Sequence, residues 1–397
     1  MAKNFFDKVR PTFSEGGKLS WLHSSFDAFE TFFFVPNRTT RKGGTHVKDC
    51  VDLKRLLIIV VIALMPALLF GIWNLGFQHS KVFGLGWGFW QMVWYGFVKI
   101  IPLYLISYIV GLGIEFASAQ MKGHEVSEGY LVSGFIIPLI VPVDVPWWML
   151  AIAVAFAVII GKEVFGGTGM NIWNPALLAR AFLFFSYPSK MSGDSIWVGG
   201  LNKALAGGTP WKGGEVVDAL SGATPLSHAS LDGLSAAGTS AWNLFLGDIP
   251  GAVGETSVIA ILLGALILLC TGVASWKIMC SSVLGALFVG WLGTSFGVTD
   301  IPCWEQLLMG GFAFGTVFMA TDPVTSAQTE TGKWIYGFLI GALCITVRLF
   351  NPGYPEGMML AILLMNTFAP LIDTMLSAPM STAVSRGLKP SSNEYQQ

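Results

Sequence analysis

The sequence predicts an all-α protein that crosses a membrane many times. Hydrophobic residues make up 53 % of its 397 residues and charged residues only 12 %, whereas a soluble domain carries about 25 % charged residues. Several apolar stretches reach the length of about 20 residues that a helix needs to span a bilayer core. Because the net charge is −1, bulk electrostatics gives no reason to expect a nucleic-acid partner.

Residues 1–55 are predicted to form a cytoplasmic extension. They hold ten of the 23 Lys and Arg residues, and such an enrichment marks the inner side of a membrane. Phenylalanines gather between Phe26 and Phe34. This pattern is typical of an amphipathic segment that lies on the bilayer or against a partner. The alternative is that these rings, Phe33 among them, form a pocket for an apolar ligand.

Ten apolar segments follow the extension. They run near 56–76, 90–116, 130–143, 147–160, 172–187, 257–275, 280–298, 307–320, 335–350 and 358–378. The third, fifth and eighth are short, and several are interrupted by Gly or Pro. Short, broken segments in two halves of a chain indicate inverted repeats. We therefore predict about ten transmembrane helices in two inverted five-helix repeats, a first membrane half over 56–187 and a second over 257–378.

The distribution of basic residues predicts the orientation of these crossings. With a cytoplasmic N-terminus and ten crossings, 16 of the 23 Lys and Arg residues fall on cytoplasmic segments and four fall outside. This asymmetry is what the positive-inside rule requires. The long polar loop 188–256 then lies on the outer side of the membrane, and the tail 379–397 lies in the cytoplasm.

The outer loop contains a stretch that suits a covalently attached phosphate group. Thr224 follows the small residues Ser221, Gly222 and Ala223, which leave its hydroxyl accessible to a modifying enzyme. Backbone N–H groups in such a concave turn also bind anions. The same stretch is a good helix start, with Thr224 as N-cap and Pro225 at the first helical position.

A glycine-rich run between the fourth and fifth segments fits neither common nucleotide-binding motif. Gly166, Gly167 and Gly169 lack both the G-x-G-x-x-G spacing and the GK[ST] ending. The run is typical of a tight turn in which glycine permits positive φ and close helix approach. The alternative is a backbone wall of a ligand site.

Charged residues at membrane depth suggest function. Most of those in this sequence lie near the end of an apolar segment, where a position at the membrane surface accounts for the charge. Asp373 is the charged residue for which this explanation fits least well. Apolar residues flank it on both sides, and Pro370 precedes it by three positions. Because hard cations prefer oxygen ligands, Asp373 together with backbone carbonyls near Pro370 is a candidate for a Na+ pathway.

Several stretches resemble one family of membrane flavoproteins. Ser221 to Thr224 resembles the motif on which the Na+-translocating NADH:quinone reductase and its Rnf relatives carry FMN. Three further runs resemble the proteins of that family: Gly161 to Ala176, Ala320 to Val324, and Asn351 to Met358. The long extension resembles the B subunit of the reductase, since RnfD, its counterpart in the Rnf complex, is expected to be shorter there.

The resemblance implies the cofactors and the residues that hold them. Thr224 would carry FMN through a phosphoester, with Ser221, Gly222 and Ala223 giving clearance and Asp218 helping recognition by a flavin transferase. Members of the family also hold non-covalent riboflavin. The resemblance makes one group of residues candidates for the wall of either flavin site: Gly166, Gly167, Thr168, Asn171, Asn174 and Arg180.

The resemblance also implies a place for the chain in a larger assembly. Ubiquinone would bind near Glu128, Gly129 and Phe33 at the cytoplasmic side. Electrons would come from FMN on a partner subunit, pass through FMN and riboflavin to ubiquinone, and drive Na+ export across a bacterial inner membrane. NADH oxidation and iron–sulfur centres would belong to the A, C, D, E and F subunits.

Two other functions agree with parts of the sequence. RnfD also carries FMN on threonine but is coupled to ferredoxin; the 55-residue extension argues against it. A urea-channel-like solute transporter would suit the predicted five-plus-five repeat. In that case the outer loop would be inert and Thr224 would be only a helix cap.

Overall fold

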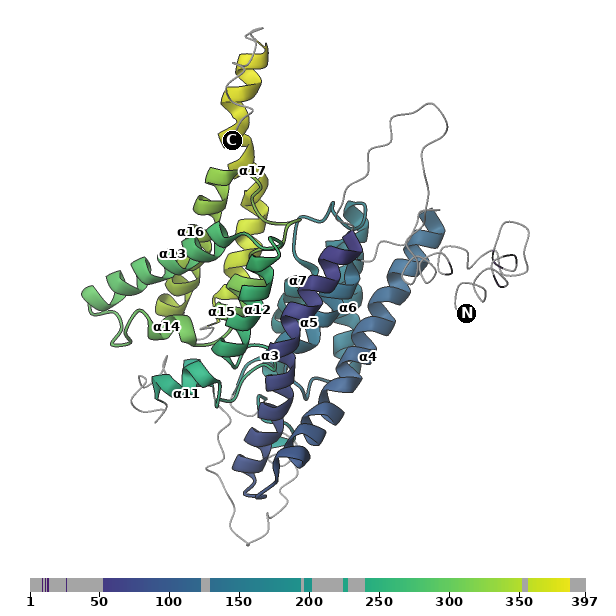
Figure 1. The fold of residues 1–397 in the computed structure, drawn as a ribbon, viewed down its shortest axis with the longest axis vertical. Helices are drawn as coiled ribbons and strands as arrows, with labels where there is room; N and C mark the ends of the chain where they lie inside the picture. Colours follow the sequence, from purple (N-terminus) through teal and green to yellow (C-terminus); the bar gives the residue numbers. More distant parts are fainter. Residues whose placement is uncertain are drawn as a thin grey trace.

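The computed structural model describes residues 53–122, 129–193, 196–201, 224–227, 240–351 and 356–385, with the isolated positions 9, 11, 13 and 26. In these ranges every regular element is helical, as Figure 1 shows. The first half contains α3 (Leu53–Val82), α4 (Phe89–Lys122), α5 (Tyr130–Ile140), α6 (Trp147–Gly161), η2 (Glu163–Phe165), α7 (Pro175–Ser186) and α8 (Pro188–Met191). After α11 (Ala241–Leu246), the second half contains α12 (Val258–Cys270), α13 (Trp276–Ser295), α14 (Glu305–Leu308), α15 (Phe312–Phe314), η3 (Gly315–Met319), α16 (Glu330–Phe350) and α17 (Met358–Ser385).

The expected class of polytopic helical membrane protein is confirmed. Within the described ranges, six helices are long and apolar enough to cross a bilayer: α3, α4, α6 with its continuation to Phe165, α13, α16 and α17. The helices α5, α7 and α12 are apolar but shorter. At 1.5 Å per residue they reach about 17–20 Å, less than the bilayer core of about 30 Å. The total of ten crossings therefore stays a prediction.

Each predicted apolar segment contains helix, but the eighth is divided. The region predicted as 307–320 consists of α14, α15 and the π-helical turn η3. The division falls at Met309, which is extended, and at Gly310, which has φ of 60°. Glycine tolerates this left-handed conformation, which interrupts the helical hydrogen-bond pattern. The apolar run alone gave no sign of it.

The two halves share part of their packing order. In the first half α4 packs on α6 and α6 on α7, and in the second half α13 packs on α16 and α16 on α17. Helix α12 packs on α3 and so joins the halves. The start of α3 and the end of α17 lie at the same end of the bundle in Figure 1, as an even number of crossings requires. The inverted symmetry itself and the domain boundaries stay predictions.

Small residues allow the closest helix contact, between α13 and α16. A Cβ atom at Gly341 would overlap with the carbonyl oxygen of Ser282, and one at Gly285 with the carbonyl oxygen of Phe338. Helices in lipid associate through such close backbone approach, because lipid tails are as apolar as the side chains that they would replace.

Candidate functional site

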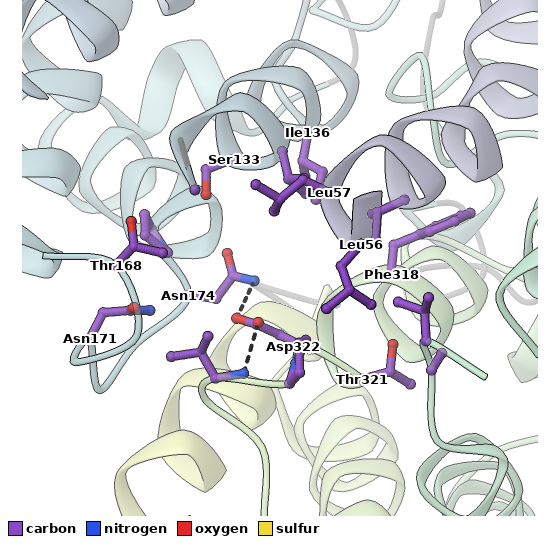
Figure 2. A pocket seen from close by; sticks show the side chains of 18 of the residues that line it. Leu56, Leu57, Ser133, Ile136, Thr168, Asn171, Asn174, Phe318, Thr321 and Asp322 are labelled. Carbon is purple, nitrogen blue, oxygen red and sulfur yellow. Dashed lines mark hydrogen bonds between the residues drawn. The ribbon is translucent and has the colours of Figure 1, made fainter. Parts of the chain in front are cut away.

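A cavity of about 130 Å³ lies between the two halves at the end of the bundle where α3 begins (Figure 2). Its walls come from the start of α3, the start of α5, the segment after α6, the start of α7, the end of α12 and the loop after η3. Most of the lining is apolar, from residues such as Leu57, Ile136 and Phe318. A few polar groups converge on it, which is typical of a small-molecule site.

Asn174 links the two halves at this cavity. Its side-chain oxygen accepts a hydrogen bond from the backbone N–H of Ala176 at 3.0 Å, and so caps α7, which begins at Pro175. Its amide nitrogen donates to Asp322 Oδ2 at 3.4 Å, as Figure 2 shows. Asn and Pro in these two positions are a strong helix start. The cap therefore fixes the orientation of the Asn174 side chain, with its amide nitrogen directed at Asp322 in the second half of the chain.

Asp322 lies in the loop after η3 and is surrounded by donors. It accepts from the backbone N–H of Val324 at 3.2 Å and from Thr325 Oγ1 at 3.0 Å, besides Asn174. Burial raises the pKa of the Asp322 carboxyl above its ordinary value, although these three hydrogen bonds oppose the rise. The cavity thus has a carboxyl group on its second-half wall that is held in place by hydrogen bonds.

Two polar residues, Lys162 and Thr168, belong to the first-half wall, and Glu115 lies behind Lys162. Thr168 Oγ1 lines the cavity and has no hydrogen-bond partner among the described residues. Lys162 also lines it and forms an ion pair with Glu115 on α4. The second carboxylate oxygen of Glu115 is buried and likewise has no partner within the described ranges. Buried polar atoms without partners are rare in folded proteins, so Thr168 Oγ1, which lines the cavity, is suited to meet a ligand.

The glycine-rich run forms the expected tight turn. Gly166, Gly167 and Gly169 have φ of 118°, 100° and 93°, values that other residues rarely adopt. The N–H of Gly167 donates to the carbonyl oxygen of Lys162 at 3.1 Å. Thr168 and Asn171, which flank the end of the turn, line the cavity, whereas Gly166 and Gly167 are not among the lining residues.

Arg180 lies away from this cavity, unlike the expectation that placed it with Asn171 and Asn174. It is six residues along α7 from Asn174, or about 9 Å at the helical rise. It forms ion pairs with Glu255, which precedes α12, and with Glu356, which precedes α17. Both partners lie far from Arg180 in the sequence, and no local pattern predicts the pairing.

Thr224 lies beside these two glutamates. It is half-buried and borders a small cavity of about 20 Å³, together with Glu255, Glu356 and Thr256. Thr224 Oγ1 accepts from the backbone N–H of Ser227 at 3.2 Å, which is the predicted N-cap. Leu226, two residues on, packs with Leu244, Ile249 and Met309. Thr224 and Arg180 therefore belong to one site around Glu255 and Glu356, distinct from the cavity at Asn174.

Asp373 has a different environment from the one expected. Its carboxylate accepts from the N–H of Gln328 at 2.8 Å, from the N–H of Thr329 at 2.9 Å and from Thr329 Oγ1 at 2.6 Å. These are donors at the start of α16, so Asp373 fastens α17 to that helix start. Helix α17 continues through Pro370, whose carbonyl accepts from Thr374 Oγ1 at 2.7 Å. No group of three metal-binding side chains occurs among the described residues.

The remaining predicted site residues fall into two groups. Gly129 lines the cavity. Phe33, Glu128, Asp218, Ser221, Gly222 and Ala223 lie outside the described residues. Sequence reasoning missed Glu255 as a site residue. It stands just before an apolar segment, where a carboxylate is usually a helix-start residue, and only the fold brings it to Arg180.

The helices and these two sites define a multi-pass membrane protein with buried polar chemistry at both ends of its bundle. The model of the NQR2, RnfD, RnfE family matches residues 40–380, and the chain belongs to this family. The resemblance found in the sequence is therefore confirmed.

Individual relatives are similar over nearly their whole length. The chain is 42 % identical to the B subunit of the Na(+)-translocating NADH-quinone reductase of Chromohalobacter salexigens, over 94 % of this chain and 93 % of the relative. It is 41 % identical to the B subunit of the reductase of Ectopseudomonas mendocina, over 93 % and 95 %. With the same subunit of Pseudomonas aeruginosa strain PAO1 the identity is 40 %, over 94 % and 95 %.

Proposed function

We propose that the chain is the flavin-carrying membrane subunit of a Na+-pumping NADH:ubiquinone oxidoreductase in a bacterial inner membrane. Membership of the family and the length over which its B-subunit relatives align support this function. The observation that carries the proposal is the position of Thr224, a half-buried threonine at the mouth of a small cavity beside buried charged residues. The A, C, D, E and F subunits would oxidise NADH and deliver electrons.

Thr224 would hold FMN through a phosphoester on its side-chain oxygen, on the outer side of the membrane. The N–H of Ser227 points at this oxygen at 3.2 Å and can keep donating to it after esterification. Ser221, Gly222 and Ala223 would leave room for the attachment, and Asp218 would help a flavin transferase to recognise the site. When bound, the flavin supplies one-electron chemistry, and the protein around it sets its potential.

The cavity at Asn174 would hold the second, non-covalent flavin, riboflavin. The fit is supported by Thr168 Oγ1, which lines the cavity and lacks a partner among the described residues. Asn171 and Asn174 add amide groups that can bond to a ring system rich in carbonyl and nitrogen acceptors. Ubiquinone would be reduced close by, near Gly129, Glu128 and Phe33, at the cytoplasmic end of the bundle.

Na+ would be exported in step with this electron transfer, and Asp373 remains the candidate in its pathway. The three donors that surround the Asp373 carboxylate would have to move aside for a cation to bind. Opening of the α16 start would therefore accompany ion passage at this residue. This links the proposed route to a movement of α17 against α16.

A solute transporter remains the second candidate function, and one observation favours it. Thr224 Oγ1 forms the N-cap contact with the N–H of Ser227, so a purely structural role would explain the residue. RnfD is less favoured, because the three relatives compared with this chain are B subunits of the reductase and align along 93–95 % of their length.

In-gel fluorescence separates the two functions. The chain is produced together with a flavin transferase, denatured, and viewed under ultraviolet light. The wild-type band and the Thr256→Val band should fluoresce, because Thr256 borders the same cavity but is not in the motif. The Thr224→Val band should be dark. A dark wild-type band in a competent host would refute the flavoprotein and favour the transporter.

A further inference from the structure

The ion pair between Lys162 and Glu115 is buried within the membrane part of the protein. Both residues are 2 % exposed. Glu115 is on α4 and Lys162 follows the last residue of α6. Taking two charges out of water is costly, and a buried pair often contributes less stability than well-packed apolar residues of the same size. Stability of the fold alone therefore does not account for this pair.

A neighbouring ion pair already joins the same two elements. Lys122, near the end of α4, lies 2.9 Å from Glu163 Oε2, and Ser118 on α4 also donates to this oxygen. The Lys122 side chain is 41 % exposed, and neither Lys122 nor Glu163 lines the cavity. This outer pair holds α4 against η2, the segment that follows α6. The buried pair of Lys162 and Glu115, called the inner pair below, is thus not needed to hold these elements together.

Lys162 of the inner pair instead has unused hydrogen-bonding capacity at the cavity. Lys162 lines the cavity, and an ammonium group has three donors. Its one hydrogen bond within the described residues goes to Glu115. Thr168 Oγ1, which also lines the cavity, is buried and has no partner among the residues that the structure describes. A buried polar atom without a hydrogen-bond partner has lost its hydration without compensation. A ligand that pairs with the Lys162 ammonium and Thr168 Oγ1 would recover that loss.

We propose that Lys162, oriented by Glu115, is the charged group that recognises the redox ring in this cavity. The ligand class is a flat conjugated ring with carbonyl oxygens, to which the ammonium and Thr168 donate. When such a ring gains an electron, the fixed positive charge favours the reduced form. Lys162 keeps its proton in this step, and the only change is the electron on the ring. This inference rests on the proposed function, in which the cavity serves electron transfer.

Lys162 is here a positioning residue that sets the potential of the ring. Its charge cannot be screened by water, because both members of the pair are buried. Flavin potentials respond to charges next to the ring. Two rings share this carbonyl chemistry, a non-covalent flavin and a quinone, and the experiment distinguishes them.

The test replaces the pair together in the assembled complex. Lys162→Met with Glu115→Leu removes the ammonium at the cavity wall together with the carboxylate behind it. Neither charge is left buried and unpaired, so the fold is expected to survive. Lys122→Met is the matched control, because that lysine is outside the cavity. Lys162→Gln is a second variant that keeps a donor but no charge, and Lys162→Arg should restore the wild-type behaviour.

Non-covalent flavin is extracted and counted per chain, and its midpoint potential is measured. The double variant should either lose this flavin or hold it with a lower midpoint potential. The equilibrium constant for one-electron reduction should fall about tenfold, which lowers the midpoint potential by about 59 mV. Unchanged flavin with a raised quinone KM and an unchanged kcat would identify the ring as the quinone. If flavin content, potential and quinone KM all match those of Lys122→Met, the proposal is wrong.

The covalent FMN is read separately in the same samples by in-gel fluorescence. A dark wild-type band would refute the attachment at Thr224, whereas the extracted flavin and the quinone kinetics would still report on Lys162. Failure of the proposed function and failure of this inference are therefore distinguishable.

Discussion

Glu255 is predicted to make the protein less stable as the pH rises through neutrality. It lies just before α12, is 8 % exposed and forms an ion pair with Arg180. Burial raises the pKa of the Glu255 carboxyl from 4.5 to about 7, because desolvation outweighs the attraction of Arg180 and the nearby Glu356 charge adds to the rise. The folded state therefore favours the protonated carboxyl.

The size of the effect follows from this difference in pKa. In the unfolded chain the carboxyl keeps its pKa of 4.5, against about 7 in the folded protein. Each unit corresponds to about 1.4 kcal/mol. The stabilisation is complete below pH 4.5 and is lost as the pH rises through about 7. The free energy of unfolding should thus fall by about 3 kcal/mol over this range.

Denaturant unfolding of the detergent-solubilised protein, measured from about pH 4 to about pH 8.5, checks this prediction. The variant Glu255→Gln keeps the shape of the side chain without its titration. The difference in unfolding free energy between wild type and variant should change with pH. As the pH rises, the wild type should become less stable relative to the variant. A difference that stays constant across the range would refute the reasoning.

Two further substitutions test the hydrogen bonds that join helices. Asn174→Ala removes the cap on α7 at Ala176 and the hydrogen bond to Asp322. It should destabilise the protein by about 1 kcal/mol or more and lower the content of non-covalent flavin. An unchanged thermal midpoint would contradict the capping role. Tyr336→Phe removes the 2.6 Å hydrogen bond to Asn366, which is fully buried. It should cost about 1–3 kcal/mol in denaturant unfolding, with no loss of covalent flavin.

The helices were predictable because their signal is local. A run of apolar residues has to be helical inside a bilayer, since lipid offers no partner for backbone polar groups. Each predicted segment accordingly contains helix. The division of the eighth segment at Met309 and Gly310 was not predictable, because the apolar composition continues across it.

The candidate sites were predictable only where their residues are close in sequence. Thr168, Asn171 and Asn174 meet at one cavity as expected, because a single turn carries them. Their partner Asp322 is 148 positions away from Asn174, and only the packing of the two halves brings it there.

The ion pairs of Arg180 could not be predicted from the sequence for the same reason. Its partners Glu255 and Glu356 are 75 and 176 positions away. A charge in an apolar segment predicts that a partner exists, but not which of the chain's carboxylates it is. This is why the sequence grouped Arg180 with its neighbours on α7 and the structure places it beside Thr224.

Peptide mass spectrometry of the chain purified with its complex tests the flavin attachment most directly. The peptide that contains Thr224 should carry the added mass of one FMN minus water, with fragment ions that place it on the threonine. The same peptide from a Thr224→Val chain should be unmodified. An unmodified Thr224 in a complex that was made with its flavin transferase and still reduces quinone would contradict the account.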